Sequence, residues 1–188
     1  MPIITFPDGS VKNFSNKVNS FEIAENISPS LAKVAIASKI NDDLWDLNRE
    51  IKEDSSIEII TKKNSEALDL IRHACAHIMA EAVLEIFPET QVTIGPTIDN
   101  GFYYDFFRKT PFTTNDLDLI ENKMHEIVDR DEQIQREVWT RSNAKKFYEE
   151  NNEPFKIELI DAIPENQKVT FYRQGNFIDL CRGPHPTS

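Results

Sequence analysis

The chain has 188 residues, of which 39% are hydrophobic and 28% charged, a composition typical of a globular protein with one or two domains. Its formal net charge of −11 excludes a protein that binds nucleic acid through a broadly basic surface. No apolar run is long enough to span a bilayer and the first residues lack the features of a signal peptide, so we expect a cytoplasmic protein without membrane contact.

The first sixty residues alternate short strands with one helix. Residues 2–6 and 11–14 predict a hairpin, because the Pro-Asp-Gly-Ser between them favours a turn. Ser20 is expected to cap a helix that extends to Ile27 and ends before Pro29. Further strands are predicted at 34–40, 44–47 and 57–61. We therefore expect a sheet that wraps one helix.

A different pattern begins after residue 62. Residues 66–87 are dense in Ala, Leu, Ile and Met and end before Pro88, which predicts a long, mostly buried helix. Strands are then predicted at 92–98, 102–107, 134–140, 169–172 and 177–181, and helices at 117–130 and from a capping Ser142 to 151. The fold class is therefore α+β, with domains at 1–62 and 63–188. Neither part is basic, because residues 1–63 carry 8 basic and 10 acidic groups and the rest 13 and 22.

Two histidines on the long helix are the first candidate functional residues. His73 and His77 are four positions apart, so their side chains project to the same side of the helix. With Asp69 and Glu81 they form a polar stripe, and its simplest interpretation is the solvent-facing side of an amphipathic helix. A zinc protease is excluded, because the segment His-Ala-Cys-Ala-His lacks the glutamate that follows the first histidine in such enzymes.

A second cluster lies at the end of the last predicted strand, where Asp179 is followed by Cys181 and His185. A tetrahedral zinc site of three nitrogens and one sulfur would result if Cys181 and His185 joined the two helical histidines. The same four groups could instead bind a polar substrate and transfer protons without a metal. The spacing leaves both hypotheses open.

Four other residues matter as context. Lys156 lies in a mainly apolar stretch, which is typical of a lysine whose stem packs on the protein while its ammonium reaches water. Tyr104 alternates with other aromatic residues along a strand, half of which must face a core. We expect Cys75 to be a buried core thiol and His125 to lie on the surface.

Taken together, five segments resemble the amino-terminal part of the bacterial-type threonyl-tRNA synthetase family. They are Pro7–Ser10, His73–His77, Ile94–Asp105, Glu153–Lys156 and Asp179–His185. The resemblance covers almost the whole chain. It implies a TGS domain, a ubiquitin-like β-grasp, at residues 1–62, followed by an α/β editing domain with a long helix packed on a mainly antiparallel sheet at 63–188. It also implies that the aminoacylation core and the anticodon-binding domain are absent and that the editing domain is truncated at its end.

The implied activity is the hydrolysis of serine wrongly attached to threonine tRNA. Serine and threonine differ by one methyl group, which binding can discriminate by only ~1 to 3 kcal/mol, so a second, hydrolytic site is needed. The resemblance implies that His73 transfers protons and that Lys156 stabilises the carbonyl or a water. Five further residues would hold the seryl-adenosine: His77, Tyr104, Asp179, Cys181 and His185. From its charge, Asp179 is also a candidate for binding the α-ammonium of the substrate.

The expected partners are the 3′ end of threonine tRNA carrying serine and the remaining synthetase domains, with no cofactor for editing. A zinc-dependent aminoacyl-tRNA deacylase, similar to alanyl-tRNA editing domains, is the alternative, with the metal on His73, His77, Cys181 and His185. Lys156 favours the metal-independent version, because it can supply the positive charge that zinc would provide. A third hypothesis is a non-enzymatic adaptor whose TGS domain binds RNA or protein.

Overall fold

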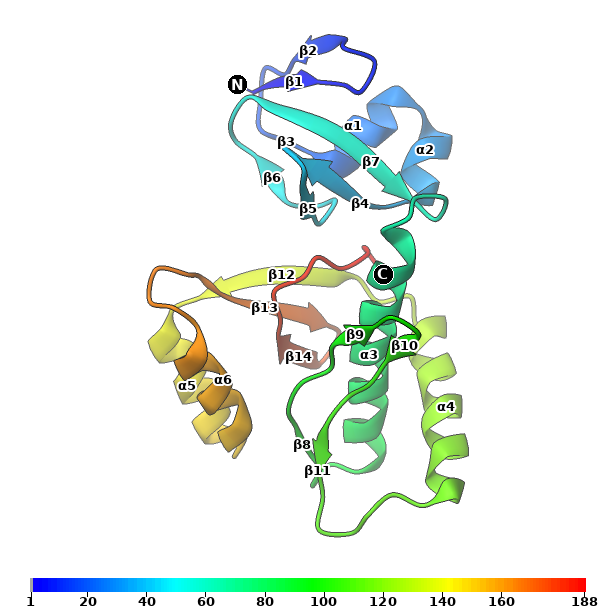
Figure 1. Cartoon of the computed structure of the whole chain (residues 1–188), viewed down its shortest axis with the longest axis vertical. Helices are drawn as coiled ribbons and strands as arrows, with labels where there is room; N and C mark the ends of the chain where they lie inside the picture. The colour runs from blue at the N-terminus through cyan, green and yellow to red at the C-terminus, as the bar shows by residue number, and fades with distance from the viewer. Residues whose placement is uncertain (1) are drawn as a thin grey trace. The chain divides into compact units, whose positions relative to one another are not determined.

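The structure, a computed structural model, describes residues 2–188, which form two compact units (Figure 1). The first contains the residues up to Ile71 together with Gly183–Thr187, and the second contains Arg72–Arg182 and Ser188. Among residues 2–188, no helix has both the length and the apolar character needed to cross a membrane.

The first unit is built on a five-stranded sheet in the order β2-β1-β7-β4-β5. Its strands are β1 (Ile3–Thr5), β2 (Val11–Asn13), β4 (Ala35–Ile40), β5 (Asp43–Trp45) and β7 (Ser55–Thr61). β1 and β7 are parallel neighbours, and every other pair is antiparallel. Two short strands, β3 (Val18–Asn19) and β6 (Glu50–Ile51), pair separately. This arrangement agrees with the predicted β-grasp and α+β class.

The first helix of this unit has a different cap from the predicted one. In α1 (Ser20–Ile27), Asn19 Oδ1 accepts from the Glu22 amide at 2.9 Å, and Glu22 Oε2 accepts from the Asn19 amide at 3.1 Å. The prediction of Ser20 as the cap is therefore wrong. Its hydroxyl is instead buried against the Ser38 hydroxyl at 2.7 Å. Ile23, on the inner face of α1, packs in the core with residues of the sheet such as Ile4 and Ile57.

A second helix, α2 (Pro29–Val34), follows where the sequence suggested that helical structure ends. The Ser28 hydroxyl caps it by accepting from the Leu31 amide at 3.1 Å. Proline is compatible with the first helical turn, because the amide that it lacks would have no partner there. The strand predicted from residue 34 consequently starts at Ala35.

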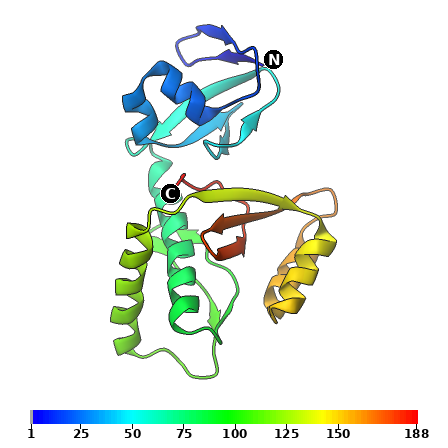
Figure 2. The same cartoon turned by 180° about the vertical axis from the view of Figure 1, so that it is seen from behind.

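The second unit combines a three-stranded antiparallel sheet with helices. The sheet has the order β12 (Ile134–Trp139), β13 (Val169–Gln174), β14 (Phe177–Leu180). The long helix α3 (Ala67–Ile86) packs along α4 (Thr114–Asp129) through a core that includes Val83 and Ile127. Both views show α3 and α4 side by side (Figures 1 and 2).

Two further helices, α5 (Arg141–Glu150) and α6 (Pro154–Ala162), pack against the sheet through residues such as Tyr148, Ile160 and Phe171 (Figure 2). Thr140 caps α5 by accepting from the Asn143 amide at 3.2 Å, so the prediction of Ser142 as its cap is wrong. α6 was not predicted, because its short apolar stretch has no clear helical period.

The segment between α3 and α4 is an interrupted ribbon. β8 (Gln91–Val92) pairs with β11 (Phe106–Phe107), and β9 (Thr97–Ile98) pairs with β10 (Gly101–Phe102). Between the two pairs, the Tyr104 ring packs directly on the backbone of Gly95, where a Cβ atom would lie 2.2 Å from the ring. The absence of a side chain at Gly95 therefore allows Tyr104 to turn inward, where it is 9% exposed.

Candidate active site

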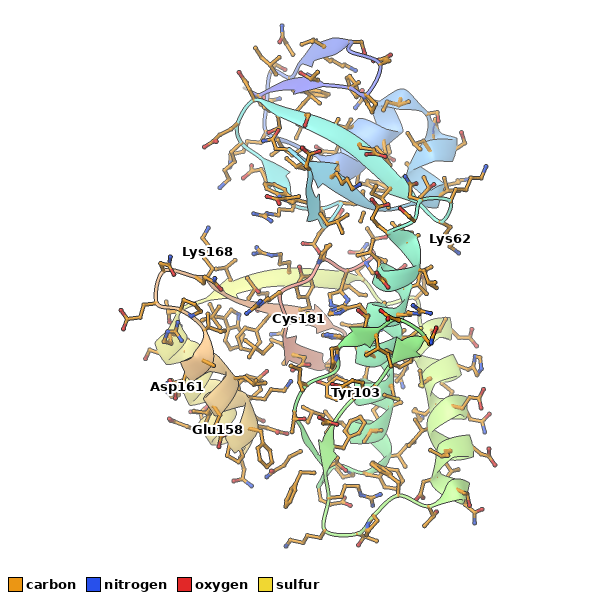
Figure 3. All side chains as sticks on the ribbon, viewed as in Figure 1. Lys62, Tyr103, Glu158, Asp161, Lys168 and Cys181 are labelled. Atoms are coloured by element: carbon orange, nitrogen blue, oxygen red, sulfur yellow. The ribbon has the colours of Figure 1, made fainter. Side chains whose placement is uncertain are left out.

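A cavity of about 580 Å³ lies within the second unit, among α3, the ribbon, α6 and the β13–β14 pair. Six of the seven predicted site residues line it: His73, His77, Tyr104, Lys156, Asp179 and Cys181. They come from four separate segments of the chain. Cys181 follows β14 and lies between the three-stranded sheet and α3 (Figure 3).

One wall of the cavity carries the two helical histidines. His73 Nε2 lies 3.0 Å from Cys181 Sγ, and the ring centroids of His73 and His77 are 5.1 Å apart. His77 also meets the edge of Phe177 in a T-shaped contact at 6.1 Å. The interpretation of the polar stripe as a solvent-facing side is wrong for His77 and Glu81, which are 8% and 4% exposed.

Burial keeps both imidazoles neutral at neutral pH. It lowers the pKa of His73, and the charge of Asp179 opposes this effect only in part. The pKa of His77 is lowered well below its ordinary value, first by burial and then by His73 and Lys156. A neutral imidazole has one donor and one acceptor nitrogen, so it can accept a proton from a bound hydroxyl or water.

The lining of the cavity also contains a buried ion pair. Lys156 Nζ lies 2.6 Å from Asp179 Oδ1, and the two side chains are 1% and 2% exposed. The Tyr104 hydroxyl donates to Asp179 Oδ2 at 2.7 Å and accepts from Lys156 Nζ at 3.1 Å. Lys156 therefore does not reach bulk water, and the interpretation of its ammonium as solvent-exposed is wrong.

Tyr148 completes this network and was not found from the sequence. Its hydroxyl accepts from the Leu180 amide at 2.9 Å and donates to Asp179 Oδ1 at 3.3 Å. Burial and the charge of Asp179 raise the pKa values of Tyr104 and Tyr148 well above the usual value, so both phenols remain protonated donors. Nothing in the local sequence distinguishes Tyr148 from an ordinary aromatic core residue.

The seventh predicted residue, His185, lies in the segment that groups with the first unit. There its backbone amide donates to Asp46 Oδ1 at 2.9 Å. Its place in the site stays a prediction. Of the residues expected elsewhere, His125 is exposed, and Cys75 is a free, partly buried thiol.

Three donors in the second unit fit a metal by their chemistry. The ligand atoms of His73, His77 and Cys181 lie within 4.8 Å of one another. Tetrahedral zinc with ordinary bond lengths would separate a nitrogen and a sulfur ligand by about 3.5 Å. The distance of 3.0 Å between His73 Nε2 and Cys181 Sγ is shorter and matches a hydrogen bond. These groups can thus supply zinc ligands after a small rearrangement.

Comparison with known proteins finds one domain family and a set of similar ligases. Residues 2–61 match the TGS domain. The chain is 55% identical, over 185 of its residues (98% of its length), to the threonine–tRNA ligase of Rickettsia bellii (strain OSU 85-389). It is 53% identical over the same length to those of Bartonella quintana (strain Toulouse) and Rhodopseudomonas palustris (strain ATCC BAA-98 / CGA009). The chain spans only 28–29% of these relatives. The resemblance inferred from the sequence segments is confirmed: the chain has a TGS domain and is similar to one part of these ligases.

Proposed function

We propose that this chain is part of a threonine–tRNA ligase and that its second unit hydrolyses serine from mischarged threonine tRNA. The observation that carries this proposal is the composition of the cavity: its lining combines two neutral histidines with a buried lysine. An ester bound in this cavity would have both a base and a positive charge among the side chains that line it. A volume of about 580 Å³ suits a small polar ligand.

The proposed reaction is attack of water on the carbonyl of the seryl ester at the terminal adenosine. His73 accepts the proton, either from the water or through the neighbouring ribose hydroxyl, and the proton then passes to the leaving 3′ oxygen. Lys156 and Tyr104 stabilise the negative charge that develops on the carbonyl oxygen. Because an ester is already activated, no covalent intermediate with Cys181 is required; its thiol positions the His73 ring.

Asp179 has a different environment from that of a free carboxylate. Oδ1 is contacted by Lys156 and Tyr148, and Oδ2 by Tyr104. In this proposal the α-ammonium of serine joins that network at its edge, while Asp179 mainly holds Lys156 in place. The overall charge of −11 is consistent with a unit that receives only the 3′ end of the tRNA, while other domains of the ligase bind its body.

The test is the hydrolysis of seryl-tRNA at saturating substrate. We expect His73→Ala to lower the rate by about 10² to 10⁴, the usual contribution of a general base, and Lys156→Ala to lower it as well. His125→Ala is the matched control, because this histidine is exposed on α4, and its rate should equal that of the unchanged protein. Unchanged hydrolysis in both His73→Ala and Lys156→Ala would rule out this mechanism.

A zinc-dependent deacylase is the second candidate, favoured by three donors whose ligand atoms lie within 4.8 Å of one another. His73, His77 and Cys181 would hold the ion, which would supply a Lewis acid when bound. Metal analysis after purification without nickel distinguishes the two. Stoichiometric zinc that is lost in Cys181→Ser supports the zinc enzyme, whereas full activity of zinc-free protein in chelator supports the metal-independent one.

A further inference from the structure

A second cavity, of about 400 Å³, lies in the same unit and shares no lining residue with the first. It is lined by the turn that follows α3, the β8–β11 pair with the residues after β11, and the loop between α5 and α6. Gln91 Nε2 donates to the carbonyl of Asn152 at 3.1 Å and so connects β8 to that loop. The proposed hydrolysis uses none of these residues.

Three buried polar atoms on its lining residues have no hydrogen-bond partner among residues 2–188. They are Thr90 Oγ1, Arg108 Nε and Glu153 Oε2. Thr90 is 2% exposed, and the side chain of Arg108 is 9% exposed. Burying a polar atom without a partner is unfavourable, so three such atoms on residues around one cavity favour the binding of a polar ligand there.

Arg108 is held in a fixed orientation. Its guanidinium lies over the ring of Phe87 at 4.0 Å and near that of Phe112 at 4.7 Å. One terminal nitrogen contacts Glu89 Oε1 at 3.3 Å. A planar guanidinium fixed in this way is well suited to an oxyanion, because it offers several donors in a rigid geometry. Lys109 adds a second positive charge to the lining.

The two acidic residues of the lining oppose an anion only weakly. The Glu89 side chain is 61% exposed, so water screens its charge. Burial raises the pKa of Glu153 to about 7, although Lys156 and a hydrogen bond from the Val92 backbone act in the opposite direction. Near neutral pH a large fraction of Glu153 is therefore protonated and can donate a hydrogen bond, as Thr90 and Arg108 can.

We propose that this cavity binds a phosphate group, held by Arg108 and hydrogen-bonded by Thr90 and Glu153. A tetrahedral oxyanion has enough acceptor oxygens to satisfy all three side chains at once. The group comes either from a small phosphorylated molecule or from an RNA backbone. Because no residue of the first cavity takes part, this site does not depend on the proposed hydrolysis.

Sulfate is a suitable probe, because it stays a dianion near neutral pH. We expect sulfate to shift the amide resonances around Thr90 and Arg108 in the whole chain. Arg108→Gln should weaken its binding at least about tenfold, and Thr90→Val about three- to tenfold, as expected for losing a charged and a neutral hydrogen bond. Arg173→Gln is the matched control, since Arg173 pairs with Glu137 at 2.7 Å outside this cavity, and should leave sulfate binding unchanged.

Competition identifies the source of the phosphate. Displacement of sulfate by an RNA hairpin with a single-stranded 3′ end assigns the site to RNA, and displacement by inorganic phosphate alone assigns it to a small molecule. Thr90→Val keeps the test valid if Arg108→Gln does not fold, because the Thr90 hydroxyl has no partner to lose within the described chain. The proposal is overturned if sulfate causes no shifts around Thr90 and Arg108. It is also overturned if Thr90→Val, and Arg108→Gln where this variant folds, bind sulfate as tightly as the unchanged protein does.

Discussion

Lys156 and Asp179 are the residues at which stability and activity are most closely connected. Each is almost fully buried, so removing one leaves an unpaired charge in the interior. We expect Lys156→Met to lower the free energy of unfolding by about 3 to 5 kcal/mol, and Lys156→Met with Asp179→Leu to recover most of that loss. Urea unfolding measures both.

Lys146→Met is the control for this comparison. Lys146 is a surface lysine whose Nζ lies 3.7 Å from Glu150 Oε1. Its replacement should change the free energy of unfolding by less than about 0.5 kcal/mol. If the double variant is as unstable as Lys156→Met alone, the unpaired charge is not the cause of the loss.

The candidate site shows which residue properties can be predicted from a sequence. The spacing of His73 and His77 on one helix predicted that they share a direction, and the structure brings Cys181 to them. The burial of Lys156 could not be predicted, because an apolar stretch around a lysine is equally typical of one that reaches water. Tyr148 was missed because its role depends on a carboxylate 31 residues away.

At the level of elements, the patterned helices, α1 among them, and most strands were predicted within a few residues, whereas the caps, the helices α2 and α6 and the short pair β3–β6 were not. Asn19 and Ser20 are both good capping residues, and what decides between them is the burial of Ser20 against Ser38 on another element. The ribbon strands were predicted as continuous, but the contact between Gly95 and Tyr104 interrupts them. Such contacts are long-range and leave no local pattern.

The packing of α3 on α4 buries a carboxyl group that should make stability depend on pH. Glu81 is 4% exposed and lies 3.5 Å from Arg130, which is held mainly by Glu85 at 2.6 Å. Burial, followed by the charges of Glu85 and Glu132, raises the pKa of Glu81 to about 7. The folded state therefore binds a proton more tightly than the unfolded state does.

It follows that Glu81 destabilises the fold progressively as the pH rises from about 4.5 to 7, since over this range the folded state keeps a proton that the unfolded state loses. We expect the free energy of unfolding of Glu81→Gln to exceed that of the unchanged protein by an amount that grows across this window, by about 3 kcal/mol in total. Denaturant unfolding at several pH values measures the difference. Parallel pH profiles for the two proteins would contradict this account.

For the molecule as a whole, the sequence predicted the α+β class and the TGS domain, which the structure and the family comparison support. The seryl ester as substrate rests on the family resemblance and on the composition of one cavity. Six of the seven predicted site residues lie in the second unit, and the proposed chemistry requires no residue of the TGS domain. The TGS domain is free in this proposal to serve another purpose within the ligase.

The most direct test of the central claim is the hydrolysis of seryl-tRNA and threonyl-tRNA by this chain, with a chelator present and substrate saturating. We expect the seryl ester to be hydrolysed well above its spontaneous rate without added metal, and the threonyl ester to be spared by roughly 10- to 200-fold, the discrimination available from one methyl group. Hydrolysis of neither ester above the spontaneous rate, or hydrolysis that stops in chelator and returns with zinc, would contradict it.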